Sequence, residues 1–206
     1  MDGPELLNKL GTLLFDPDGD VWNNDEKTSA VNEAINTIVL LRPDAAAVTE
    51  STALTADTPK QSIPSTGLRF LDIVMNTGGA PVRKIKREVL NETIPAWTTT
   101  TGSAIKHVMF DEENPKIFWV YPVPLTGFSV ELTFAKKITE FTSKATSLGL
   151  DDIYIAPIIE YVLHRCLGMP GKGSDMGKSA RHLSNFYNAL GVKHKADAIL
   201  KQVQES

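Results

Sequence analysis

The chain has 206 residues, and its 42% hydrophobic content can fill the core of one domain or of two small ones. Its 21 basic and 25 acidic residues give a formal net charge of -4, which argues against a protein whose whole surface binds phosphates. The single cysteine, Cys166, excludes an internal disulfide and a cysteine-based zinc site, and the acidic start and lack of a long apolar run favour a cytoplasmic chain without a membrane partner.

The first 48 residues carry helical patterns. A short apolar start is followed by the turn DPDGD, after which Asn23 or Asn24 can cap a helix. One apolar stripe of this helix consists of Val31, Ala34, Ile35, Ile38 and Leu41. Because proline restricts the residue before it, we expect the helix to end at Arg42.

Residues 49–145 have the composition of a β-rich region. Threonine and proline recur, and the apolar runs are short and rich in aromatic or β-branched residues. The predicted strands are Lys60–Ile63, Leu68–Met75, Val82–Arg87, Ile105–Phe110, Ile117–Tyr121 and Phe128–Ile138, with a possible short helix over Glu88–Trp97.

Residues 146–206 return to helical spacing. One predicted helix runs from about Ile155 to Cys166, with Pro157 tolerated in its first turn. A second starts near Met176 and ends at Gly191, a good C-terminal cap. A last short segment places Ile199, Leu200 and Val203 on one side.

These patterns predict an α+β fold. Each terminal helix has one apolar face, so residues 1–48 and 146–206 should pack together as a helical bundle, with residues 49–145 inserted as a β-rich subdomain. The tail after Gly191 has an apolar side but is too short to be stable alone, so it should dock on its own bundle or on another protein.

The stretch PGKGSDMGKSAR, residues 170–181, nearly matches a phosphate-binding loop. Gly177, Lys178 and Ser179 fit its end, but the first glycine of the pattern, which four residues must separate from Gly177, falls on Lys172. The preceding segment is helical, whereas a phosphate loop follows a strand. We expect a connector between helices, and keep a nucleotide-dependent enzyme built on Lys178 and Ser179 as an alternative.

The segment DPDGDVWNNDEK resembles a calcium loop, with Asp16, Asp18 and Asp20 at its first, third and fifth positions. Such a loop needs glycine at position six and glutamate at twelve, where this chain has Val21 and Lys27. A turn that leads into a helix is the better interpretation, and we predict no metal site.

Catalytic patterns are also missing. Cys166 and His164 are two residues apart on a helix and point in different directions, and the histidines lack metal-ligand spacing. No G-x-S-x-G nucleophile elbow occurs. We therefore predict no catalytic residue, no cofactor and no enzyme.

The densest basic cluster is RKIKR, with Arg83, Lys84, Lys86 and Arg87 on a predicted strand. Alternation puts Lys84 and Lys86 on one face and Arg83 and Arg87 on the other with Ile85. The cluster suits a solvated edge strand, a contact with a partner protein, or binding to a nucleic-acid backbone.

The order of several motifs gives a resemblance. From about Trp22 to Lys193 the chain carries in turn IVLLRPDA, KQSIPSTGLRFLDIVMN, REVLNETIPAW, NPKIFWVYPVP, YVLHRCLGM and ARHLSNFYNALGVK. In this order they resemble the head-to-tail adaptor family of short-tailed bacteriophages, relatives of the tail tubular protein A of T7-like phages. The glycine-rich connector at residues 168–177 and the tail after Gly191 depart from that pattern.

The resemblance implies a structural virion protein, made in the host cytoplasm and placed in the head-tail neck. Copies, typically a dodecamer, would form a ring between the portal protein and the tail nozzle protein, and DNA would pass through the lumen without sequence-specific binding. Ile199, Leu200 and Val203 would dock on the portal, and the RKIKR cluster would meet a neighbouring subunit or the nozzle. Another neck or stopper protein of a phage is the nearest alternative.

Overall fold

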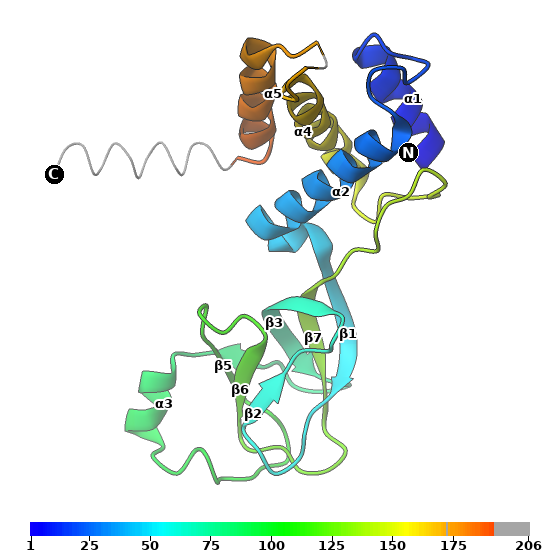
Figure 1. Cartoon of the computed structure of the whole chain (residues 1–206). Helices are drawn as coiled ribbons and strands as arrows, with labels where there is room; N and C mark the ends of the chain where they lie inside the picture. Colours follow the sequence, from blue (N-terminus) through cyan, green and yellow to red (C-terminus); the bar gives the residue numbers. More distant parts are fainter. Residues whose placement is uncertain (172, 192–206) are drawn as a thin grey trace, which may run out of the picture. The chain divides into compact units, whose positions relative to one another are not determined.

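The computed structural model describes residues 1–171 and 173–191, and its helices and strands fall into two units (Figure 1). Of the described residues, the first unit takes Met1–Ala45 and residues 138–171 and 173–191, and the second takes Ala46–Lys137. Helices make up the first unit, and both sheets lie in the second. The predicted fold class, α+β with helical ends and a β-rich insertion, is confirmed.

Side-chain caps fix where the first two helices begin. In α1 (Gly3–Leu13), Asp2 accepts a hydrogen bond from the N–H of Glu5 at 2.9 Å. In α2 (Asn24–Leu41), Asn23 and Glu26 form a reciprocal capping box. This helix ends one residue before the predicted position, and a 3-10 turn follows it (Pro43–Ala46).

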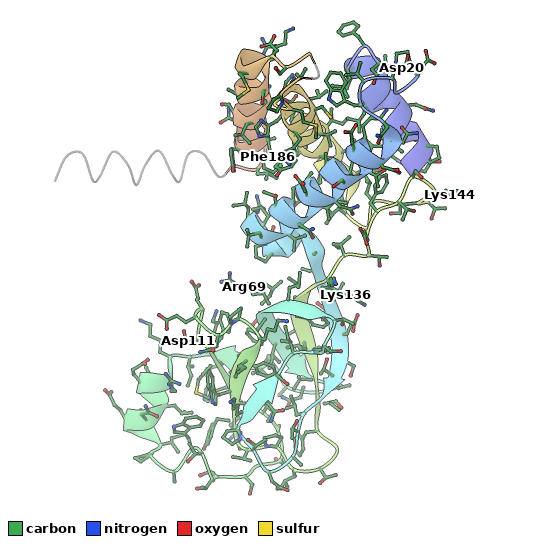
Figure 2. All side chains as sticks on the ribbon, in the orientation of Figure 1. Asp20, Arg69, Asp111, Lys136, Lys144 and Phe186 are labelled. Carbon is green, nitrogen blue, oxygen red and sulfur yellow. The ribbon has the colours of Figure 1, made fainter. Side chains whose placement is uncertain are left out.

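The helix α4 (Ile155–Leu167) is the centre of the helical unit, because it packs against both α2 and α5 (Met176–Ala189). It follows a 3-10 turn (Asp152–Tyr154), and its third residue is Pro157, in the first turn as predicted. Phe186 on α5 is fully buried in the same core (Figure 2). Gly191 has φ of +67° and directly follows Leu190, the C-cap of α5, which confirms the predicted cap.

The chain returns to the helical unit through a segment without regular structure. Phe141 is buried among the helices, and both its backbone groups bond to the amide of Asn32 on α2. Asn32 donates to the Phe141 carbonyl at 2.9 Å and accepts from its N–H at 2.8 Å. Residues 138–145, which composition groups with the β-rich region, therefore lie in the helical unit.

Three strands form the first sheet of the second unit. β7 (Ser129–Lys136) lies between β1 (Ala47–Ala53) and β3 (Gly67–Asn76), and both pairings are antiparallel. β1 was not predicted from the sequence. Its residues are almost all exposed, so the sequence AVTESTA lacks the apolar alternation by which a strand is recognised.

The second sheet has four strands in the order β2-β6-β5-β4. They are β2 (Lys60–Ser62), β6 (Ile117–Tyr121), β5 (His107–Phe110) and β4 (Arg83–Lys84), and β4 runs parallel to β5. Side chains from both sheets meet in one core, in which the rings of Phe70 and Phe118 stack with centroids 4.8 Å apart.

The other face of the four-stranded sheet is also covered. Met109 and Tyr121 alternate with Val108 and Val120 along β5 and β6 and pack against Leu90 of α3 (Arg87–Thr93). Because α3 begins at Arg87, the predicted strand over residues 82–87 is wrong in extent. Its ladder ends with the N–H of Ile85 bonded to the Val108 carbonyl at 3.0 Å.

Asn32→Ala should lower the free energy of unfolding of the helical unit by about 2 kcal/mol, because it leaves both backbone groups of Phe141 without their partner. Urea unfolding followed by circular dichroism at 222 nm measures this. Asn36→Ala, at an exposed position of the same helix, is the matched control and should change stability by less than about 0.5 kcal/mol. Equal effects of the two substitutions would contradict the bridging role of Asn32.

Candidate interaction surfaces

The basic segment of residues 83–87 lies at the edge of the four-stranded sheet and at the start of α3. Arg83 and Lys84 form β4, an edge strand, while Arg87 is the first residue of α3. All four cationic residues of the segment are exposed. The edge position agrees with the prediction, but the four cations do not share one strand.

Two of these cations rest on aromatic rings. The Nζ atom of Lys84 lies 5.2 Å from the ring centroid of Phe110, and Cζ of Arg87 lies 5.2 Å from that of Trp119. Phe110 pairs with Phe118, whereas Trp119 is the next residue along β6, so the two rings belong to opposite faces of the sheet. The basic segment is thus divided between two faces, each contact adding about 0.5–1 kcal/mol.

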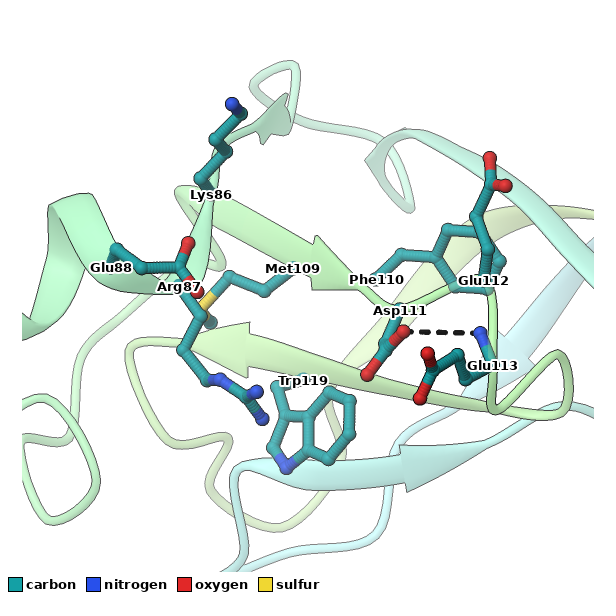
Figure 3. A pocket seen from close by; sticks show the side chains of 9 residues that line it. All are labelled: Lys86, Arg87, Glu88, Met109, Phe110, Asp111, Glu112, Glu113 and Trp119. Atoms are coloured by element: carbon teal, nitrogen blue, oxygen red, sulfur yellow. Dashed lines mark hydrogen bonds between the residues drawn. The ribbon is translucent and has the colours of Figure 1, made fainter. Parts of the chain in front are cut away.

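A depression of about 490 Å³ opens beside Trp119. Figure 3 shows Arg87 on one side of the indole ring and Asp111 and Glu113 on the other. The acidic residues belong to the turn after β5, where the N–H of Glu113 donates to Asp111 at 3.1 Å. The complete lining is Lys86, Arg87, Glu88, Met109, Phe110, Asp111, Glu112, Glu113 and Trp119.

The charges around this depression set what it can bind. Carboxylates on one wall repel a phosphate chain that the cations on the other wall would attract. A protein segment that carries both signs of charge and an apolar or aromatic side chain matches both walls and the Trp119 ring. The depression therefore favours a protein contact over a nucleic-acid contact.

A second exposed feature is the loop after α1, residues 15–22, here called the Phe15 loop. Phe15 has φ of +57°, a left-handed conformation that is rare outside glycine, and its side chain is 96% exposed. Leu13, at the end of α1, and Val21, within the loop, are also exposed. The fold does not bury the ring of Phe15, although the backbone there is strained. The ring is therefore available to a partner protein.

The carboxylate of Asp16 holds the Phe15 loop in shape. It accepts hydrogen bonds from the N–H groups of Trp22 at 2.8 Å, Asp20 at 2.9 Å and Val21 at 3.2 Å. The bond from Trp22 is the largest cause of a lowered pKa of Asp16, which the charge of the buried Lys27 lowers further and burial opposes. The segment is a turn that leads into α2, as expected. Its first carboxylate, Asp16, accepts hydrogen bonds from backbone N–H groups.

The residues of the stretch that resembles a phosphate-binding loop also have partners within the fold. Asp175 caps α5 by accepting from the N–H of Lys178 at 2.9 Å, and the ammonium of Lys178 lies 3.2 Å from the same carboxylate. Ser179 is buried and donates to the His164 carbonyl at 2.9 Å. The loop joins two helices, as predicted, and an acidic cap at this helix start disfavours a phosphate.

The described histidines and the cysteine are hydrogen-bonded or at least partly buried within the fold. His164 bonds to Ser179, and Nδ1 of His182 lies 2.8 Å from Glu160. Burial lowers the pKa of His107, and Cys166 is buried in the helical core. Within residues 1–171 and 173–191 no group of three or more His, Cys, Asp or Glu side chains is placed to hold a metal, and no helix is long and apolar enough to cross a membrane.

The sequence prediction and the structure overlap only in part at these surfaces. Ile199, Leu200 and Val203, proposed from the sequence as a docking side, lie outside the described residues, as does His194. The exposure of Phe15 and the role of Trp119 were not predicted. In the sequence, the acidic run Asp111–Glu113 is the signal that could have pointed to the depression. Its position opposite Arg87 is known only from the structure.

The comparisons with known proteins give one family. A model of the SU10 adaptor protein family matches residues 1–203 of the chain. No curated protein matches it.

Phe15→Gly should raise the free energy of unfolding by about 1 kcal/mol, because glycine adopts the left-handed conformation without strain and the exposed ring buries no surface to lose. Thermal unfolding measures the gain. Phe15→Ala keeps the Cβ atom and should gain little, which isolates the backbone effect from removal of the ring. A loss of stability in the glycine variant would show that the ring packs in solution.

Proposed function

Because the chain belongs to the SU10 adaptor protein family, we propose that it forms a ring that joins the portal protein to the tail nozzle protein and extends the DNA channel. The match over residues 1–203 is the observation that carries the proposal. It makes the chain a structural phage adaptor protein of the virion neck, in a family that is no enzyme class. The predicted adaptor family is thereby confirmed, whereas the narrower likeness to the tail tubular protein A of T7-like phages is not.

A closed ring needs two different surfaces on each subunit that complement each other. The chain offers separate candidates on its two units, the Phe15 loop on the helical unit and the charged depression on the β-rich unit. Both surfaces are held in shape by the fold. Hydrogen bonds to Asp16 hold the Phe15 loop, and the pairing of β5 with β6 holds the depression. Rigid surfaces of this kind favour assembly, because little conformational entropy is lost when they bind.

The charge distribution supports a channel that lets DNA slide. A net charge of -4 and the division of the basic segment between two sheet faces leave no continuous cationic patch on that segment to hold phosphates. In this proposal Arg83, Lys84, Lys86 and Arg87 contact a neighbouring subunit or the nozzle. The same charges make a nucleic-acid-binding module the weaker candidate.

The portal contact is assigned to the C-terminal segment on its sequence alone. Ile199, Leu200 and Val203 lie on one side if the segment is helical, and such an apolar side requires a partner surface. The virion neck is then the place of action, after synthesis in the host cytoplasm.

Purified chain mixed with purified portal protein should form a complex whose mass exceeds that of the portal by many copies of 22.5 kDa, close to a dodecamer. Mass photometry measures the increment, and negative-stain images should show an added ring layer. The portal alone and the chain alone are the controls. The proposed function would be contradicted if the chain bound neither the portal nor, in a parallel experiment, the nozzle protein. Binding of a single copy to the portal would also contradict it.

Replacing Ile199, Leu200 and Val203 together by aspartate should abolish co-purification with the portal, because charged groups cannot enter an apolar contact. Gln202→Ser with Gln204→Ser, in the same segment, is the matched control and should bind as the unchanged chain does. Circular dichroism should be the same for both variants. Portal binding by the aspartate variant would refute the docking segment and leave the ring proposal standing.

A further inference from the structure

β1 is an unusual edge strand. It pairs with β7 over seven consecutive residues, from Ala47 to Ala53, without a register shift, and its other side is the edge of the sheet. Its side chains are mostly exposed, and Val48 is the residue that packs partly against the core. Main-chain hydrogen bonds, more than burial, hold the strand in place.

The outward-facing groups of β1 follow from the ladder. The N–H of Leu54 donates to the Phe128 carbonyl at 2.9 Å, so alternate residues from Leu54 backwards direct their main-chain groups toward β7. Thr49 and Ser51 are out of that phase, and the 2.8 Å contact between the hydroxyls of Thr49 and Thr133 fits the closer, non-hydrogen-bonded type of pair. Their N–H and C=O groups therefore point away from the sheet, and no group in the described part of the chain bonds to them.

The other edges of both sheets are blunted. β3 has three register shifts, and part of its edge is taken by Asn76 bonding to Ala80 and by Val82 bonding to Val74. β2 has three residues between prolines at positions 59 and 64. β4 has two residues, both cationic, and leads into α3. Shortness, bulges, proline and positive charge are the means by which proteins keep edges from pairing.

β1 lacks all of these protections. It contains no proline, no lysine, no arginine and no bulge. Its one charge, on Glu50, is matched by the ammonium of Lys136 at 2.9 Å. An unprotected edge of this length is a template for an added strand.

We propose that the β1 edge accepts an extended strand from another protein of the virion neck. The added strand bonds through its main chain to Thr49 and Ser51. On one face it meets the hydroxyls of Thr49 and Ser51, which already bond to Thr133 and Thr77, so small or hydroxyl-bearing side chains fit there. The inference rests on the proposed adaptor function, because that function supplies the neighbouring proteins.

A copy of this chain does not fit the site as well as a different protein does. Two β1 edges that face each other are related by a two-fold axis, which closes a dimer and cannot continue around a ring. The remaining edges in the described ranges are too short or bulged to supply a partner strand. We therefore assign the donor to an extended segment of about seven residues from a different protein of the neck.

Amide hydrogen exchange tests the proposal on the whole chain. In the free protein the amides of Thr49 and Ser51 should exchange quickly and those of Glu50 and Thr52 slowly, because only the latter are bonded to β7. Purified portal protein and purified nozzle protein are added in separate experiments. One of them should slow exchange at Thr49 and Ser51 by at least about tenfold, as a new main-chain bond does.

Ser51→Pro is the matching variant, since it removes an outward N–H and leaves the β1–β7 ladder intact. It should weaken binding of the protecting partner about tenfold or more, with unchanged thermal unfolding. Ser51→Ala loses the hydroxyl but keeps the N–H, so it should weaken binding less than Ser51→Pro does. Thr52→Pro breaks the ladder instead and should lower the unfolding temperature.

The outcomes separate the two proposals. If a partner binds but exchange at Thr49 and Ser51 stays fast and Ser51→Pro binds normally, the edge inference is overturned and the adaptor function stands. Protection in the chain alone at high concentration would overturn the foreign donor in favour of self-pairing. If neither portal nor nozzle binds, the proposed function itself fails.

Discussion

The closure of the helical unit is the constraint on which the rest of the structure depends. Its helices come from two parts of the chain that are far apart in sequence. Helices α2 and α4 can bury their apolar faces against each other only when the chain returns after the β-rich unit. The amide of Asn32 fixes the returning segment at Phe141, where no regular element could bond the backbone. The residues between the two parts must then fold on their own, and they do so around the core shared by the two sheets.

The exposed groups of this arrangement suit contacts with other proteins. The polar side chains that could suggest a reaction are satisfied within the fold, as in the contacts of Ser179 with His164 and of Lys178 with Asp175. The described part of the chain leaves exposed a ring at Phe15, a charged depression at Trp119 and the open edge of β1. A structural adaptor needs such surfaces, because its work is done by contacts with other proteins.

The helices could be predicted from the sequence because their signals are local. Asn23 with Glu26 marks the start of α2, and an apolar stripe marks the buried side of α4. β1 could not be predicted in this way, since its stability comes from a ladder with a strand that is remote in sequence. The same holds for the depression, where Arg87 and Asp111 become neighbours only through the turn after β5 and the start of α3. The left-handed backbone of Phe15 has no signal in its residue type.

A reconstruction of the neck of purified virions by electron cryomicroscopy tests the central claim most directly. The adaptor account predicts a layer of repeated subunits between portal and tail in which both units of this chain fit as separate bodies, around a lumen wide enough for duplex DNA. A neck in which the portal contacts the tail with no density for this chain would contradict it.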